Sequence, residues 1–159
     1  MRLKPDFNLK SIYDISIFNL KAREAEAVFF DLDSTVMRSK SGVFAPETLE
    51  FLSMLSKHFK IAIISNNNNK KYIEKARSQV NFPVIGSAKK PDIKVLLKTC
   101  KDMNVNPAHC AFVGDRPLTD ILCARRAGMI SVLVDSISRE QEKKTVRFVR
   151  WVERLSIKK

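Results

Sequence analysis

With 159 residues, of which 45% are hydrophobic and 29% charged, the chain has the size and composition of one globular domain, expected to span residues 1–159. No apolar run reaches the roughly 18 residues that a membrane-spanning helix needs, and the N-terminus lacks the apolar core of a secretory signal, so we expect a cytoplasmic protein. The 29 lysines and arginines against 17 acidic residues leave a net charge of +12. This excess favours polyanionic surroundings: nucleic acid, an anionic lipid surface or an acidic substrate.

Strand and helix signals alternate along the chain. Residues 1–15 form a mixed, polar lead-in, and Ser16 can cap a short helix that ends at Ala22. Apolar runs predict strands at residues 27–31, 60–64, 83–86, 110–113 and 130–134. Helical spacing and helix-end residues predict helices at 46–57, 70–79, 91–103 and 119–127. This alternation predicts an α/β fold with a single, doubly wound, mainly parallel sheet and helices on both faces.

The first predicted strand ends in two aspartates, Asp31 and Asp33, which are followed by Ser34 and Thr35. Ligands of open α/β sheets bind beyond the carboxyl ends of the strands, and residues i and i+2 of an extended chain share a side. Both carboxylates can therefore face one small site, where they repel each other unless a cation or a shared proton intervenes. The alternative is a surface turn, because the same residue types are common in turns.

Polar residues follow other predicted strands as well. Ser65 and Asn66 follow the strand at 60–64, Asp115 follows the strand at 110–113, and Lys90 precedes the helix between them. Parallel strands present their carboxyl ends at one edge of the sheet, so these segments are expected to converge there with the aspartate pair. Convergence of four segments by chance is much less expected than any single motif.

The order and spacing of these segments resemble the haloacid dehalogenase (HAD) superfamily of phosphatases. Its four motifs match residues 31–35, 65–66, 90–91 and 114–120 within a core of about residues 27–134. A finer resemblance, to the YqeG-like branch of capless subclass IIIA, rests on residues 10–15, 64–67, 88–91, 115–120 and 126–128. That branch is similar to the phosphatidylglycerophosphate phosphatases of mitochondria and plastids. Ser34 and Arg116 depart from it, standing where the branch usually has Asn and Gln, which leaves substrate choice open.

The resemblance implies catalysis through an aspartyl-phosphate with Mg²⁺ as cofactor. Asp31 would be the nucleophile, and Asp33 would protonate the leaving oxygen and then deprotonate water. The metal ligands would be the carboxylates of Asp31 and Asp115 and the backbone carbonyl of Asp33. The alternative for Asp33 is a turn residue without a catalytic role.

The remaining motif residues are implied to act on the phosphoryl group or on the acids. Ser65, Asn66 and Lys90 would bind the phosphoryl oxygens, and Asp120 would orient Asp115 or a metal-bound water. The neighbouring Lys89 is the alternative to Lys90, but the Lys-Pro pair favours Lys90. Asp120 could also be purely structural.

The stretches between the motifs, residues 34–64 and 66–89, are too short for an inserted cap domain of about 50 residues. We therefore expect an open site. By analogy with other capless members of the superfamily, which tend to act on large or surface-presented phosphates, we expect a substrate of that kind.

The C-terminal segment is basic, with eight lysines or arginines against four acids in residues 135–159. A helix is expected at about 138–157, with an apolar stripe of Phe148, Trp151, Val152 and Leu155. Such a helix can lie on an anionic bilayer, or it can pack its stripe against the sheet. We favour packing against the sheet, and both hold if only the charges meet lipid.

The resemblance, together with the net charge, implies a Mg²⁺-dependent phosphomonoester hydrolase that dephosphorylates phosphatidylglycerophosphate, an anionic lipid of phospholipid synthesis, at the inner face of a membrane. One alternative is a phosphatase for a soluble nucleotide, sugar phosphate or phosphoprotein. Another is a non-catalytic basic adaptor that binds RNA or ribosomes. The second acid, Asp33, argues against the adaptor, because a binding module has no use for it.

Overall fold

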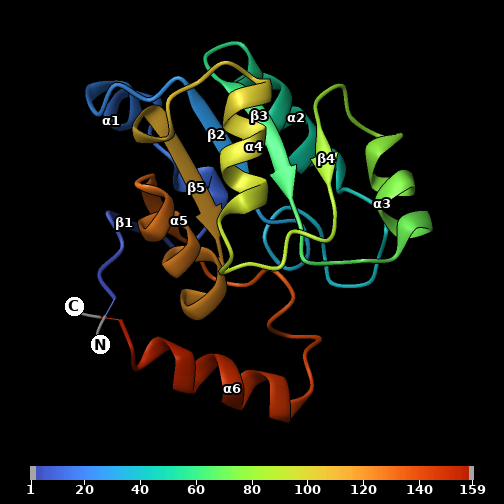
Figure 1. Ribbon diagram of the computed structural model, residues 1–159. Coiled ribbons are helices and arrows are strands. Elements are labelled where there is room, and N and C mark those ends of the chain that lie inside the picture. The colour runs from blue at the N-terminus through green and yellow to red at the C-terminus, as the bar shows by residue number, and fades with distance from the viewer. Residues whose placement is uncertain (1–2, 158–159) are drawn as a thin grey trace.

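The computed structural model describes residues 3–157 and contains one six-stranded parallel sheet (Figure 1). Its strands are β1 (Phe7–Asn8), β2 (Ala27–Phe30), β3 (Lys60–Ile64), β4 (Val84–Ile85), β5 (Cys110–Gly114) and β6 (Ile130–Leu133). They lie in the order β1-β6-β5-β2-β3-β4. The chain therefore moves outward from β2 on one side and from β5 on the other. The boundary between these two strands is the switch point of a doubly wound fold, where ligand sites form.

Helices cover both faces of the sheet, as predicted. One face carries α1 (Ile17–Ala22), α2 (Pro46–Ser56) and α3 (Lys70–Arg77), and the other carries α4 (Lys94–Asp102) and α5 (Leu122–Ala127). Ser16 caps α1, since its hydroxyl accepts a hydrogen bond from the backbone N–H of Asn19. No domain is inserted in the stretches between the described strands, which contain only these helices, single helical turns and loops.

Alternation along β2 explains the two layers. Val28 and Phe30 pack on the side of α1, α2 and α3, while Ala27 and Phe29 pack on the side of α4 and α5. All four residues are fully buried. A central parallel strand is covered on both faces, so it reads as a continuous apolar run rather than as an alternating one.

Apart from the last helix and shifts of one or two residues, three features differ from the predicted elements. The lead-in segment contributes the edge strand β1, which Asp6 anchors by accepting hydrogen bonds from the N–H and hydroxyl of Ser131 at 2.8 and 3.0 Å. Helix α4 begins at Lys94 rather than at residue 91, and Ile93 is its N-cap. The Asp92 carboxylate accepts a hydrogen bond from the Lys94 N–H at 2.8 Å, which satisfies one of the unpaired N–H groups of the first turn. A single π-helical turn (Pro117–Ile121) precedes α5.

The last helix, α6 (Lys144–Arg154), begins later than expected and lies across the carboxyl edge of the sheet (Figure 1). The prediction that it packs its apolar stripe on the sheet is wrong. Phe148, Trp151 and Leu155 are 63%, 58% and 58% exposed, whereas Glu153 is buried. The reason is electrostatic: the inward face of α6 carries Arg150, Glu153 and Arg154, which pair with charges at the sheet edge.

Within residues 3–157, no helix combines the length and the apolar character needed to cross a membrane.

Phe29→Ala should destabilise the protein by about 3–5 kcal/mol, because it removes a fully buried ring and leaves a cavity. Urea unfolding followed by far-UV circular dichroism measures this. Phe18→Ala is the matched control, since Phe18 is 80% exposed on α1, and it should change the free energy of unfolding by less than about 0.5 kcal/mol. Equal losses in the two variants would contradict the described core.

Candidate active site

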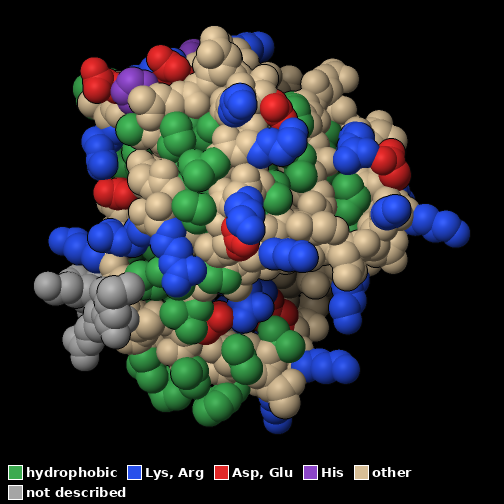
Figure 2. Space-filling model, viewed as in Figure 1, with side chains coloured by type: hydrophobic (Ala, Val, Ile, Leu, Met, Phe, Trp, Pro, Cys, Tyr) green, Lys and Arg blue, Asp and Glu red, His purple; other side chains and the backbone are tan. Residues whose placement is uncertain are grey.

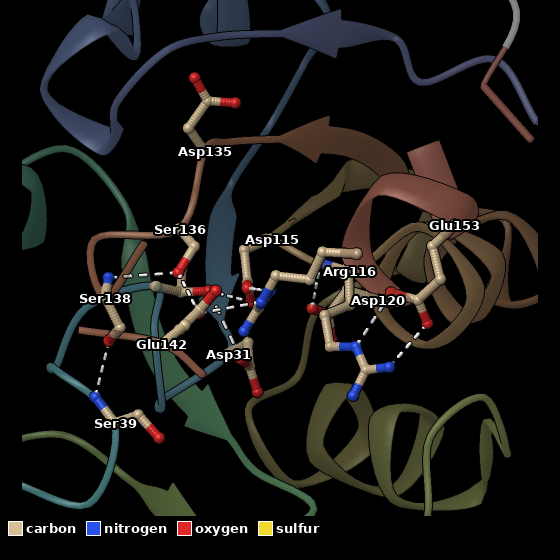
Figure 3. Close-up of polar contacts among 12 residues, drawn as sticks. Asp31, Ser39, Asp115, Arg116, Asp120, Asp135, Ser136, Ser138, Glu142 and Glu153 are labelled. Atoms are coloured by element: carbon tan, nitrogen blue, oxygen red, sulfur yellow. Dashed lines mark hydrogen bonds and ion pairs between the residues drawn. The ribbon is translucent and has the colours of Figure 1, made fainter. Parts of the chain in front are cut away.

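Three aspartates meet beyond the central strands. Asp31 directly follows β2 and Asp115 directly follows β5, and these two strands are hydrogen-bonded neighbours. Asp31 continues the ladder, since its N–H donates to the Val113 carbonyl at 2.9 Å. One carboxylate oxygen each from Asp31, Asp115 and Asp120 lie within 4.8 Å of one another. The fold therefore concentrates negative charge at its switch point (Figure 3).

Lys90 compensates two of these carboxylates. Its ammonium donates to Asp31 Oδ1 at 2.7 Å and to Asp120 Oδ1 at 2.8 Å, and its side chain is 1% exposed. Burial alone would lower the pKa of Lys90, but the charges of Asp120 and Asp31 outweigh burial and raise that pKa above its ordinary value. Lys90 is therefore a fixed cation beside the predicted nucleophile.

The position of Lys90 is set by Asn66. The Asn66 amide accepts a hydrogen bond from the Lys90 N–H at 2.7 Å and donates one to the Lys90 carbonyl at 3.0 Å. Ser65 is buried at the end of β3, where its hydroxyl accepts a hydrogen bond from the Asn67 N–H. The side chain of Asn66 thus holds the lysine loop, and its predicted contact with phosphate stays a prediction.

Asp120 lies in the π-helical turn, a deviation often found at functional sites. It is 1% exposed and accepts a hydrogen bond from the Arg116 N–H at 3.1 Å. Burial and the neighbouring charge of Asp31 raise the pKa of Asp120 to about 6. Gly114 makes this close packing possible, because a Cβ at that position would collide with the Asp120 carboxylate.

Asp115 is held by two groups that the sequence did not single out. The Thr35 hydroxyl donates to Asp115 Oδ1 at 3.1 Å, and the guanidinium of Arg150 on α6 pairs with Asp115 Oδ2. Arg150 Nε also lies 2.9 Å from Glu142 Oε1. Thr35 belongs to the aspartate motif, so its position gave a signal. Nothing in the sequence indicated that Arg150 contacts Asp115, because the two residues are 35 positions apart in the chain.

Asp33 faces a different neighbour. The Tyr72 hydroxyl on α3 donates to Asp33 Oδ1 at 2.5 Å, and burial together with this hydrogen bond raises the pKa of Tyr72 above its ordinary value. Ser34, between the aspartate and Thr35, has a φ of +67°. Asn tolerates this left-handed conformation better than most residues, which explains why Asn suits the position in the similar branch.

All of the predicted site residues except Asp115 line one cavity. It has a volume of about 290 Å³ and is lined by Asp31, Asp33, Ser65, Asn66, Lys90 and Asp120, together with Arg116, Val146 and Arg150. Asp115 does not line this cavity, although its carboxylate lies beside that of Asp31. Polar groups from five segments of the chain therefore surround one space large enough for a phosphate group.

The donor set can hold a divalent cation. Three carboxylates whose oxygens approach within 4.8 Å are the hard oxygen ligands that such cations prefer. This group contains the predicted Asp31 and Asp115 and adds Asp120. The predicted ligand from Asp33 is its backbone carbonyl, so that assignment stays a prediction.

Known proteins provide an independent comparison. A family model described as HAD-hydrolase-like matches residues 87–150. Over 151 residues the chain is 30% identical to the "Probable phosphatase YqeG" of Bacillus subtilis (strain 168), covering 94% of this chain and 87% of that protein. The crystal structure of an HAD phosphatase from Thermococcus onnurineus has the same fold, with a TM-score of 0.58, 16% sequence identity and coverage of 74% of this chain and 88% of that one. The chain therefore belongs to the HAD superfamily of phosphatases.

A second relative is longer than this chain. The match to "Phosphatidylglycerophosphate phosphatase 1, chloroplastic/mitochondrial" of Arabidopsis thaliana is 25% identical over 164 residues and covers 98% of this chain. It covers 47% of that protein, so the chain spans about half the length of this relative.

Lys90→Met leaves the buried carboxylate of Asp120 and the partly buried carboxylate of Asp31 without their ammonium. We expect the free energy of unfolding, measured with urea in the presence of EDTA, to fall by roughly 3–5 kcal/mol. In the unmodified protein the Asp120 pKa is raised to about 6. The folded state therefore binds a proton more tightly than the unfolded state, and the free energy of unfolding falls as pH rises toward that pKa. Without Lys90 the proton is bound still more tightly, so the deficit should grow from about pH 5 to about pH 8.

Lys89→Met is the control for this prediction, because the Lys89 side chain is exposed and next in sequence. It should leave the free energy of unfolding nearly unchanged. A Lys90→Met deficit that shrinks as pH rises would show that the ammonium does not compensate these carboxylates.

Proposed function

We propose that the protein hydrolyses phosphomonoesters through an aspartyl-phosphate at Asp31, with Mg²⁺ as cofactor. The observation that supports this most directly is the position of Asp31 at the switch point, 2.7 Å from the buried ammonium of Lys90. A carboxylate needs no activating base at neutral pH. Its difficulty is repulsion from the phosphoryl oxygens, which a fixed cation beside it reduces.

Hydrolysis would take two steps. A carboxylate oxygen of Asp31 attacks phosphorus, the bond from phosphorus to the leaving oxygen breaks, and Asp33 gives that oxygen its proton. Asp33 then takes a proton from the water that attacks phosphorus, the bond from phosphorus to the Asp31 oxygen breaks, and inorganic phosphate leaves, which restores both acids. Asp33 lines the same cavity as Asp31, and Tyr72 fixes the direction of its carboxylate.

Asp31, Asp115 and Asp120 would hold the metal ion with their carboxylates, and Asp33 would add its backbone carbonyl. Bound Mg²⁺ would offset the negative charge of the phosphoryl group. Of the three carboxylates, Asp115 has no contact with Lys90 and is paired with Arg150 instead. The side chains of Asp31 and Lys90 would orient the phosphoryl group.

We infer that the phosphomonoester belongs to an anionic phospholipid, phosphatidylglycerophosphate. Support comes from the Arabidopsis relative of that name, which matches nearly the whole chain, and from the net charge of +12, which suits an anionic lipid surface. Two features of the site agree with a large substrate. No domain is inserted between the strands, and the cavity of about 290 Å³ opens beside α6.

Asp31→Asn should abolish Mg²⁺-dependent turnover of p-nitrophenyl phosphate, because the amide cannot form the phosphoenzyme. Asp33→Asn should lower kcat by roughly 10²–10⁴-fold, the usual contribution of a general acid and base. Asp102→Asn, an exposed carboxylate on α4, is the matched control and should retain full activity. Full activity of Asp31→Asn, or phosphate that is never trapped on Asp31, would contradict the proposed intermediate.

Tyr72→Phe should lower kcat by roughly three- to tenfold, which is the value of one hydrogen bond that directs Asp33. KM and the melting temperature should stay nearly constant, because the ring remains in place. Tyr13→Phe is the control, since Tyr13 bonds Thr48 rather than a site residue. A rise in KM with unchanged kcat would assign Tyr72 to substrate binding instead.

Comparison of kcat/KM for phosphatidylglycerophosphate in mixed micelles with kcat/KM for soluble phosphoesters tests the substrate. A preference for nucleotide or sugar phosphates would leave the aspartyl-phosphate mechanism in place and contradict the lipid assignment.

A further inference from the structure

Helix α6 presents an apolar face to solvent. Phe148, Trp151, Val152 and Leu155 lie on one side of the helix, and their exposed fractions range from 45% to 63%. In Figure 2 hydrophobic side chains gather over α6 at the lower edge of the molecule. Exposed apolar patches on monomers commonly mark an interaction surface.

The outward orientation of this face is fixed by ion pairs on the opposite side of α6. The Glu153 carboxylate accepts hydrogen bonds from the Arg116 guanidinium at 2.7 and 3.1 Å (Figure 3). Arg154 lies 2.9 Å from Asp135, and Arg150 pairs with Asp115. These contacts are polar and partly buried, so turning the apolar face inward would break all of them and leave Asp115 without its arginine.

The same ion pairs leave an excess of positive charge beside the apolar face. Three of the four acids in residues 135–157, namely Asp135, Glu142 and Glu153, are used by arginines of the edge. Four exposed cations have no ion pair among the described residues: Arg139, Lys143, Lys144 and Arg147. The outer surface of α6 is therefore both apolar and cationic.

This surface adjoins the active site. Val146 and Arg150 of α6 line the catalytic cavity. A second cavity of about 500 Å³ lies between α6 and the preceding loop, and Arg139, Arg147 and Trp151 contribute to its lining. Arg150 belongs to both cavities, so they are neighbours. A molecule that lies against α6 can reach Asp31 with a phosphate group.

From these observations we propose that α6 docks the protein on an anionic phospholipid membrane and places the open catalytic cavity at the lipid surface. A helix of 11 residues is about 16 Å long, too short to span a bilayer, and it would lie in the interface. The combination of Trp and Phe with flanking lysines and arginines fits an anionic bilayer better than an acidic protein groove. The aromatic side chains can contact the apolar lipid chains, and the cations can contact the negative head groups. The proposal deepens the lipid assignment of the proposed function and depends on it for its purpose, but binding itself needs no catalysis.

Tryptophan fluorescence measures this docking directly, because Trp151 is the only tryptophan of the sequence. Vesicles of equal parts phosphatidylcholine and phosphatidylglycerol should shift the fluorescence of Trp151 to shorter wavelength and co-sediment with the protein. Vesicles of phosphatidylcholine alone should do so much less, and added salt should weaken binding to the anionic vesicles. Absence of binding to the anionic vesicles, or binding that does not respond to salt or to lipid charge, would overturn the proposal.

Two variants separate the apolar and the charged contributions. Phe148→Gln with Val152→Gln should weaken vesicle binding roughly tenfold or more, since both apolar contacts are lost while a good helix former replaces each. Lys143→Gln with Lys144→Gln should weaken it roughly fivefold per charge. Turnover of p-nitrophenyl phosphate should be unchanged in both variants, because none of these side chains lines the catalytic cavity.

Matched controls lie away from α6. Phe18→Gln with Val43→Gln changes two other exposed apolar residues, and Lys57→Gln with Lys101→Gln removes two exposed charges at the ends of α2 and α4. Both pairs should bind anionic vesicles like the unmodified protein. Equal losses in the controls would mean that net charge or general stickiness, rather than α6, causes binding, and would overturn the proposal.

Failure of this proposal is distinguishable from failure of the proposed function. Asp31→Asn should still bind anionic vesicles. Vesicle binding without turnover of any phosphoester would contradict the function alone, whereas turnover without vesicle binding would contradict the docking of α6 alone. A shift in Trp151 fluorescence when RNA is added, with no shift when lipid vesicles are added, would likewise overturn the membrane assignment.

Discussion

The structure of the site depends on one buried ammonium. Lys90 lies between Asp31 and Asp120 with almost no exposure, and its own loop is held by the Asn66 amide. Charges buried this deeply are tolerated only when they are paired and hydrogen-bonded. The lysine loop, the end of β2 and the π-helical turn must therefore come together as a unit, and Gly114 leaves the room that Asp120 needs. Pairing makes Lys90 a permanent cation in the position where a phosphoryl group would arrive.

The same excess of carboxylates accounts for the unusual placement of α6. One ammonium cannot compensate three acids, and the edge of the sheet also carries Asp135 and Glu142. Arginines of α6 supply the missing charge, Arg150 at Asp115 and Arg154 at Asp135. A helix that turns its arginines toward the sheet must turn its apolar stripe toward solvent. In this way the electrostatics of the candidate active site determine which surface the protein presents to its surroundings.

The fold was largely predictable because its signals are local. Buried parallel strands such as β2, β3 and β5 are continuous apolar runs, and their order with the helices follows from alternation. The differences lie where local signals are weak. Strand β1 has two residues and is defined by Asp6 and Ser131, which are 125 residues apart. The start of α4 was misplaced because Pro91 suits a first helical position, whereas the helix begins at Lys94, whose N–H donates to the Asp92 carboxylate. The orientation of α6 could not be predicted from its periodicity. The spacing of apolar residues specifies that the helix has an apolar stripe, but not whether the stripe faces the sheet or solvent.

The sequence by itself determined the chemistry that this protein can bring to its sheet edge. Asp31 and Asp33 follow one strand, Asp115 follows a second strand, and Lys90 precedes a proline. Residue type and spacing carry that information, because strand ends of a parallel sheet meet wherever the strands are placed. Only the tertiary structure decided which groups pair: Tyr72 with Asp33, Thr35 and Arg150 with Asp115, and Lys90 with Asp120 as well as Asp31. Such pairings join residues that are distant in the chain, and they depend on distances and burial that no local pattern contains.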